Sequence, residues 1–163
     1  MGEPRRSFLA RVAPELVRLA EAEPEREVCG FIVAAEDGGL EVLPVPNVAG
    51  DAHARTRFEL DPAAHLALSR RLRLEGRRPV ALYHSHVEGG ADLSPVDRER
   101  MVLDGVPVLP GVDPVVIAMR SGKAEEVRMF TWNTRIYSLR EAWTPIPGGE
   151  VESGVPGAKS EAT

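Results

Sequence analysis

The chain has 163 residues, 43% of them hydrophobic, and a formal net charge of −5 at pH 7. This length and apolar fraction suit a single domain with its own core. The negative charge, with most cations dispersed among acids, argues against a nucleic-acid-binding surface, because neutralising phosphates requires clustered Lys and Arg. No segment approaches the roughly 18 apolar residues of a membrane span, so no membrane association is predicted.

The cysteine and arginine residues indicate the cellular compartment and exclude some kinds of binding site. Cys29 is the only cysteine, which excludes an internal disulfide framework and a four-cysteine zinc site. The chain therefore fits a reducing compartment, and we expect it in the cytoplasm. One cluster of arginines is expected to be a solvated helix face and its following turn rather than a phosphate site: Arg70, Arg71, Arg73, Arg77 and Arg78.

The first third of the chain predicts a strand, a helix and a hairpin. Residues 8–12 are mostly apolar and predict a short strand, and Pro14 suits the first turn of a helix over residues 13–22. Residues 28–34 are continuously apolar, as in a strand covered on both faces. A turn signal at residues 37–39 links them to a strand over residues 40–45, so the sheet should contain an antiparallel pair.

The middle of the chain predicts a strand over residues 56–60 and a helix that starts at Asp61-Pro62 and ends at Gly76. Residues 79–86 follow as a strand whose apolar start gives way to polar residues at its carboxyl end. In open α/β sheets, sites form at such ends.

The last third predicts a helix beginning at Ser94-Pro95 and strands over residues 114–119 and 126–132. A strand or short helix is expected near residues 136–139. Beyond residue 143 the sequence is rich in Pro and Gly, so we predict a domain over residues 1–143 and a disordered tail over residues 144–163.

The chemistry concentrates at the end of the strand over residues 79–86. His84 and His86 alternate with Ser85, so both imidazoles project from one face of the strand and can reach one metal ion. Such a pair can also serve only to bind loop carbonyls. His53 and His65 lack this spacing and are expected on a loop and on a helix surface.

Asp97 follows eleven residues after His86, at the start of a helix. It would complete a set of two histidines and one carboxylate, which leaves one zinc position open, as in catalytic sites. Ser94 has two plausible roles: N-cap of that helix, or donor to the charge that develops on a polarised carbonyl oxygen.

A catalytic site also needs a carboxylate outside the ligand set to move protons. Glu27 abuts a buried strand, where a carboxylate would be rigid and partly desolvated. The charge pattern alone does not separate it from Glu25. Cys29 is expected to be a buried core residue.

The residues Glu27-x-Cys29-Gly30 and His84-x-His86, followed by Ser94 and Asp97, resemble the JAMM motif of the MPN+ zinc metalloproteases. The resemblance implies a cytidine-deaminase-like α/β fold, a three-layer sandwich with a mixed sheet flanked by helices. It also implies that His84, His86 and Asp97 bind one Zn²⁺ ion, that Glu27 is the general acid/base and that Ser94 helps to stabilise the tetrahedral intermediate. Val87 stands where the family commonly has proline, which should loosen the following loop.

Members of that family cleave after the carboxyl-terminal Gly-Gly of ubiquitin-like folds. The resemblance therefore implies a small ubiquitin-like or sulfur-carrier protein as the substrate. The alternatives are a non-enzymatic binding module with a structural metal and a zinc nucleobase deaminase. The deaminase is disfavoured because the chain lacks the Pro-Cys-x-x-Cys run of those sites.

Overall fold

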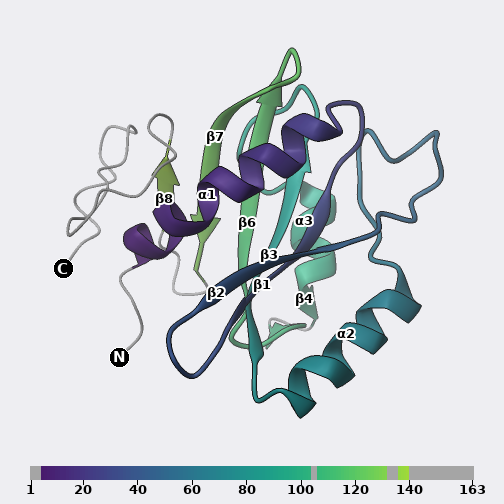
Figure 1. Cartoon of the computed structure of the whole chain (residues 1–163). Coiled ribbons are helices and arrows are strands. Elements are labelled where there is room, and N and C mark those ends of the chain that lie inside the picture. Colours follow the sequence, from purple (N-terminus) through teal and green to yellow (C-terminus); the bar gives the residue numbers. More distant parts are fainter. Residues whose placement is uncertain (1–4, 104–105, 132–135, 140–163) are drawn as a thin grey trace.

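A mixed sheet lies at the centre of the computed structural model, which describes residues 5–103, 106–131 and 136–139. Its strand order is β2-β1-β3-β6-β7-β8 (Figure 1). Among the paired strands described, β3 and β6 run parallel and the other pairs are antiparallel. The strands are β1 (Cys29–Ala34), β2 (Leu40–Val45), β3 (Arg78–His86), β6 (Asp113–Arg120), β7 (Lys123–Phe130) and β8 (Ile136–Leu139).

Helices cover both faces of this sheet. The helix α1 (Arg5–Ala22) packs Leu9 and Leu16 against one face, together with Ile32 and Ile117 of the sheet. Residues of α2 (Pro62–Leu74) and α3 (Pro95–Met101) pack against strand residues of the other face. A short hairpin of β4 (Val102–Leu103) and β5 (Val106–Pro107) follows α3. The predicted three-layer α/β fold with a mixed sheet is confirmed.

The predicted strand over residues 8–12 is wrong, because these residues belong to α1. The buried side chains of α1 recur at helical spacing, which allows one face of the helix to cover the sheet: Leu9, Val12, Ala13, Leu16 and Ala20. Pro14 lies inside the helix on its exposed face. Pro14 cannot donate to the Ala10 carbonyl, and the burial of the opposite helix face outweighs the cost of this lost hydrogen bond.

The predicted strand over residues 56–60 is also largely wrong. Only Leu60 pairs, in an isolated bridge with Asn47. The side chain of Asn47 replaces the missing ladder, because its amide donates to the Arg57 carbonyl and its oxygen accepts from the Glu59 N–H. A side chain thus satisfies backbone groups that a partner strand would otherwise satisfy.

Other predicted elements are close to the observed ones. Asp61 caps α2 by accepting from the Ala63 and Ala64 N–H groups, and Pro62 begins the helix. In the predicted arginine cluster, Arg71 and Arg77 form ion pairs with Glu75. The strand predicted to end at residue 132 ends at Phe130, and the predicted tail lies outside the described residues. None of the described helices is long and apolar enough to cross a membrane.

Candidate metal centre

The carboxyl end of β3 presents two histidines to the α2/α3 side of the sheet. Strand alternation places Leu82, His84 and His86 on this side, while Tyr83 packs on the side of α1. The His84 side chain is fully buried and stacks on Phe58, with 4.5 Å between ring centroids. The side chain of His86 is 14% exposed. One imidazole is therefore anchored in the core and the other lies at its edge.

The start of α3 brings a carboxylate to the same point. Ser94 is the N-cap of α3, its hydroxyl accepting from the Asp97 N–H at 3.0 Å. In return, the Ser94 N–H donates to Asp97 Oδ2 at 2.9 Å. This capping box confirms the predicted capping role of Ser94 and fixes the direction of the buried Asp97 carboxylate.

Three donor atoms converge between β3 and α3. His84 Nε2 lies 3.0 Å from His86 Nε2, and these two atoms lie 3.1 and 3.2 Å from Asp97 Oδ2. Zinc bonds of about 2.0–2.1 Å in a tetrahedron separate neighbouring ligand atoms by about 3.3 Å. The triangle therefore has nearly the size that one zinc ion requires, and two imidazoles with a carboxylate are a donor set that zinc accepts.

The hydrogen bonds around the imidazoles favour metal binding. His86 Nδ1 donates to the Gly90 carbonyl at 2.7 Å, which leaves the Nε2 lone pair directed at the triangle. Nδ1 of His84 is buried without a hydrogen-bond partner among the described residues, so the orientation of this ring depends on packing, including the stacking on Phe58, rather than on a hydrogen bond at Nδ1.

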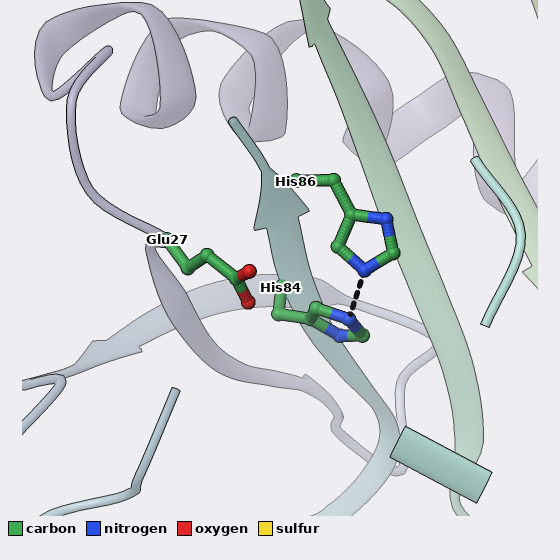
Figure 2. Close-up of side chains that lie close together, drawn as sticks. All are labelled: Glu27, His84 and His86. Carbon is green, nitrogen blue, oxygen red and sulfur yellow. Dashed lines mark hydrogen bonds between the residues drawn. The ribbon is translucent and has the colours of Figure 1, made fainter. Parts of the chain in front are cut away.

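Glu27 lies just before β1 and faces the histidines (Figure 2). Its donor atom and those of His84 and His86 all lie within 4.8 Å of one another, so these three residues could also hold a metal ion. The side chain is buried, and Oε1 has no hydrogen-bond partner among the described residues. Glu25 instead pairs with Arg55 at the surface and is 77% exposed. Of the two acidic candidates, only Glu27 lies in the cluster.

The backbone around Glu27 is held from three sides. Its N–H donates to the Ala54 carbonyl at 2.7 Å, and its carbonyl accepts from Asn47 Nδ2 at 2.9 Å. The next N–H, of Val28, donates to the Ser85 hydroxyl at 2.8 Å. Neither Ser85 nor Asn47 was predicted from the sequence to be a positioning residue. The one available signal was the place of Ser85 between the two histidines.

The electrostatics of the metal-free cluster follow from burial and hydrogen bonding. Burial raises the pKa of Glu27 to about 8, with a smaller opposing effect of His86 and a reinforcing one of Asp97. Burial also lowers the pKa of His84, which favours the neutral imidazole that binds metals. Burial alone would raise the pKa of Asp97, but the two neighbouring histidines and the hydrogen bond from the Ser94 N–H hold it well below its usual range.

Cys29 lies in the core behind this cluster, as predicted. It pairs with His84 in the register of β1 and β3, and its thiol donates to the Val45 carbonyl at 3.3 Å. Burial raises the pKa of the thiol to about 12, so it is not activated as a nucleophile.

An apolar cavity of about 260 Å³ opens beside Asp97. Its walls come from the loop before α2 and from α3, and include Phe58, Leu60 and Met101. His65 also lines it and packs on Phe31 with 5.0 Å between ring centroids. His65 is therefore partly buried rather than a helix-surface residue, whereas His53 is exposed as predicted.

Fold and site together define an α/β sandwich with a candidate metal centre at the end of its parallel strand pair. The chain belongs to the family described as prokaryotic homologs of the JAB domain, whose model matches residues 9–134. Its structure is similar to the solution structure of protein DSY2949 from Desulfitobacterium hafniense, with a TM-score of 0.55 and 20% identity over 78% of this chain and 84% of that one. At this identity the similarity shows the fold alone. No curated protein matches the sequence.

Proposed function

We propose that this protein is a zinc-dependent peptidase that hydrolyses the peptide or isopeptide bond following the carboxyl-terminal Gly-Gly of a small ubiquitin-like or sulfur-carrier protein. The observation that carries the proposal is the buried Glu27 carboxylate, whose Oε1 has no hydrogen-bond partner among the described residues, beside three convergent donors. A purely structural metal site has no need of this carboxylate, and an uncompensated buried carboxylate costs stability. Buried ionisable groups with strongly shifted pKa values concentrate at functional sites.

His84, His86 and Asp97 are the proposed ligands, because their donor atoms form the compact triangle. When bound, zinc would act as a Lewis acid toward a carbonyl oxygen and lower the pKa of a water molecule. Glu27 remains outside the ligand set in this assignment. Its carboxylate accepts the proton of the attacking water and later donates it to the departing amine.

Ser94 retains its second proposed role. Its hydroxyl oxygen accepts from the Asp97 N–H, but a hydroxyl has a hydrogen of its own to donate. That hydrogen can be directed at the carbonyl oxygen of the substrate as negative charge develops. The cap holds the hydroxyl one helical turn from Asp97, so both roles are compatible.

The apolar cavity beside Asp97 supports a protein substrate. Its volume of about 260 Å³ is below the roughly 300–1,000 Å³ of pockets for drug-sized ligands, and suits one or two apolar side chains. An extended tail could place such a side chain in the cavity and pass glycines across the metal. Glycine suits the last positions because it lets the backbone approach closely.

The test uses a sulfur-carrier protein that ends in Gly-Gly and carries a short carboxyl-terminal extension. Cleavage after Gly-Gly should be lost on chelation and restored by zinc. Glu27→Gln should bind zinc as the wild type does while losing hydrolysis by about 10²–10⁴-fold. Glu25→Gln is the matched control and should cleave normally, because Glu25 lies at the surface.

A non-enzymatic binding module is the second candidate, since this family assignment fits either a hydrolase or a binding domain. Zinc binding without cleavage of this carrier fusion or of an isopeptide-linked substrate would favour the module. Full activity of Glu27→Gln with normal zinc content would refute the role of Glu27.

A further inference from the structure

We infer that Arg128 of β7 is a positioning residue for His86, which it orients through the loop of residues 87–93. The inference rests on the proposed role of His86 as a metal ligand. No motif singled out Arg128, which lies 42 residues after His86 in the sequence.

The loop contacts His86 directly. The Gly90 carbonyl accepts from His86 Nδ1 at 2.7 Å and so selects the ring tautomer. Gly89 lies so close that a Cβ atom there would approach His86 Cβ to 3.2 Å. The ring orientation of His86 therefore depends on where the loop places these two glycines.

Three contacts fix the loop to the sheet. Ala91 is buried against Val116 and Phe130. Glu88, which has a left-handed backbone (φ 52°), accepts from the Ser121 N–H. Asp92 accepts from Arg128 Nη1 at 2.5 Å. The loop has these contacts although Val87 stands where the family commonly has proline.

Arg128 is suited to this role because it is itself held in place. Its Nε and Nη2 atoms lie 2.7 and 2.6 Å from Glu126 Oε2, and the side chain of Glu126 is only 7% exposed. The remaining nitrogen, Nη1, reaches Asp92. An exposed ion pair usually contributes little, since two long side chains must be ordered to form it. Here the buried carboxylate has already ordered the arginine.

The strand register places this anchor on the same face as the histidines. Arg128 pairs with Val116, which pairs with His84, and Glu126 pairs with Ala118, which pairs with His86. Two strand spacings, about 10 Å, separate β7 from β3. The loop thus spans from the metal ligand to its anchor across β6.

The charge of Arg128 alone would produce the opposite effect. A cation about 10 Å from the metal site repels the metal, so removing it should strengthen binding if only long-range electrostatics matter. Removing a positioning contact should weaken binding. The sign of the change therefore separates the two explanations.

The experiment measures zinc affinity of the full chain by competition with a chromophoric chelator, without substrate. Arg128→Gln and Asp92→Asn should each weaken zinc binding about 10-fold, the lower end of the range for groups that orient metal ligands. The double variant should be no weaker than either single one, because both remove the same contact. Arg18→Gln is the control, since it removes an exposed arginine paired with Glu15 on α1.

A second measurement, ¹⁵N NMR of the His86 ring in the metal-free protein, is independent of zinc binding and hydrolysis. The wild type should carry its proton on Nδ1, and both variants should populate the other tautomer. Asp92 is 77% exposed, so the His86 tautomer in Asp92→Asn tests the inference even if Arg128→Gln does not fold. The tautomer is the deciding measurement for this variant, because loss of the Asp92 charge would weaken zinc binding under either explanation. Zinc affinity within twofold of wild type in Asp92→Asn, or an unchanged tautomer, would overturn the inference. A failure of wild-type hydrolysis would count against the proposed function alone.

Discussion

Glu27→Gln should change the pH dependence of stability in the metal-free protein. Burial raises the pKa of Glu27 from 4.5 to about 8. Because the folded state holds this proton more tightly than the unfolded chain, the contribution of Glu27 is most favourable below pH 4.5 and is lost as the pH rises to 8. Glutamine has no such proton, so the variant should lack this decline.

The magnitude follows from the shift. Each pKa unit corresponds to about 1.36 kcal/mol, so the full penalty is ~5 kcal/mol, of which about 3 kcal/mol has developed at pH 7. At pH 5 the penalty is only ~1 kcal/mol. Between pH 5 and 7, the free energy of unfolding of the wild type should therefore fall relative to Glu27→Gln by about 2 kcal/mol. Entry of water beside the carboxylate would reduce this figure.

Urea denaturation in the presence of a chelator, at pH 5, 6 and 7, measures this difference for both proteins. Taking the difference between the two proteins removes the contribution of most other titrating groups. Added zinc should reduce the pH dependence, because a nearby cation stabilises the charged carboxylate. A difference that stays constant across this pH range in the metal-free proteins would refute the account of Glu27 as a strained buried carboxylate.

Three further substitutions test the packing around the site by urea denaturation. Tyr83→Phe should raise the free energy of unfolding by about 1 kcal/mol, because the buried hydroxyl has no hydrogen-bond partner among the described residues; a loss of stability would reveal a partner. Gly30→Ala should lower it by about 1–3 kcal/mol, because a Cβ atom would lie 2.6 Å from the Tyr83 oxygen and clash with the Leu43 carbonyl; wild-type stability would show that β1 can shift. Asn47→Asp should lower the free energy of unfolding by about 2 kcal/mol, because the amide donors to the Glu27 and Arg57 carbonyls are lost. Wild-type stability of Asn47→Asp would contradict this.

The strand that carries the histidines could be predicted because its signals are local. The apolar residues in the first part of β3 predict that the strand is buried. The His-x-His spacing at its end predicts that both imidazoles lie on the same face. The N-cap of α3 could be predicted for the same reason, since Ser94, Pro95 and Asp97 lie close together in the sequence. These short-range patterns were sufficient to propose the ligand set before any fold was known.

What the sequence did not predict depends on contacts between distant segments. Asn47 replaces a strand ladder, and Arg128 reaches a loop that lies 36 residues earlier. No local pattern distinguishes either residue from an ordinary loop or surface position. The start of helix α1 was predicted wrongly for a different reason. Pro14 is a helix-start signal, but tertiary packing allows the helix to continue through it.

The buried thiol of Cys29 offers a way to detect metal binding at the candidate site. It is the only cysteine in the sequence, is 2% exposed and pairs with His84 across β1 and β3. A thiol-alkylating reagent can reach it only when the side chains packed over this face of the sheet move away, so the alkylation rate in the native protein reports the free energy of that local opening. A metal ion that joins His84 of β3 to Asp97 of α3 should disfavour this opening, because Met101 of α3 belongs to the same buried cluster as Cys29. The slowing of alkylation would then report metal occupancy without a substrate.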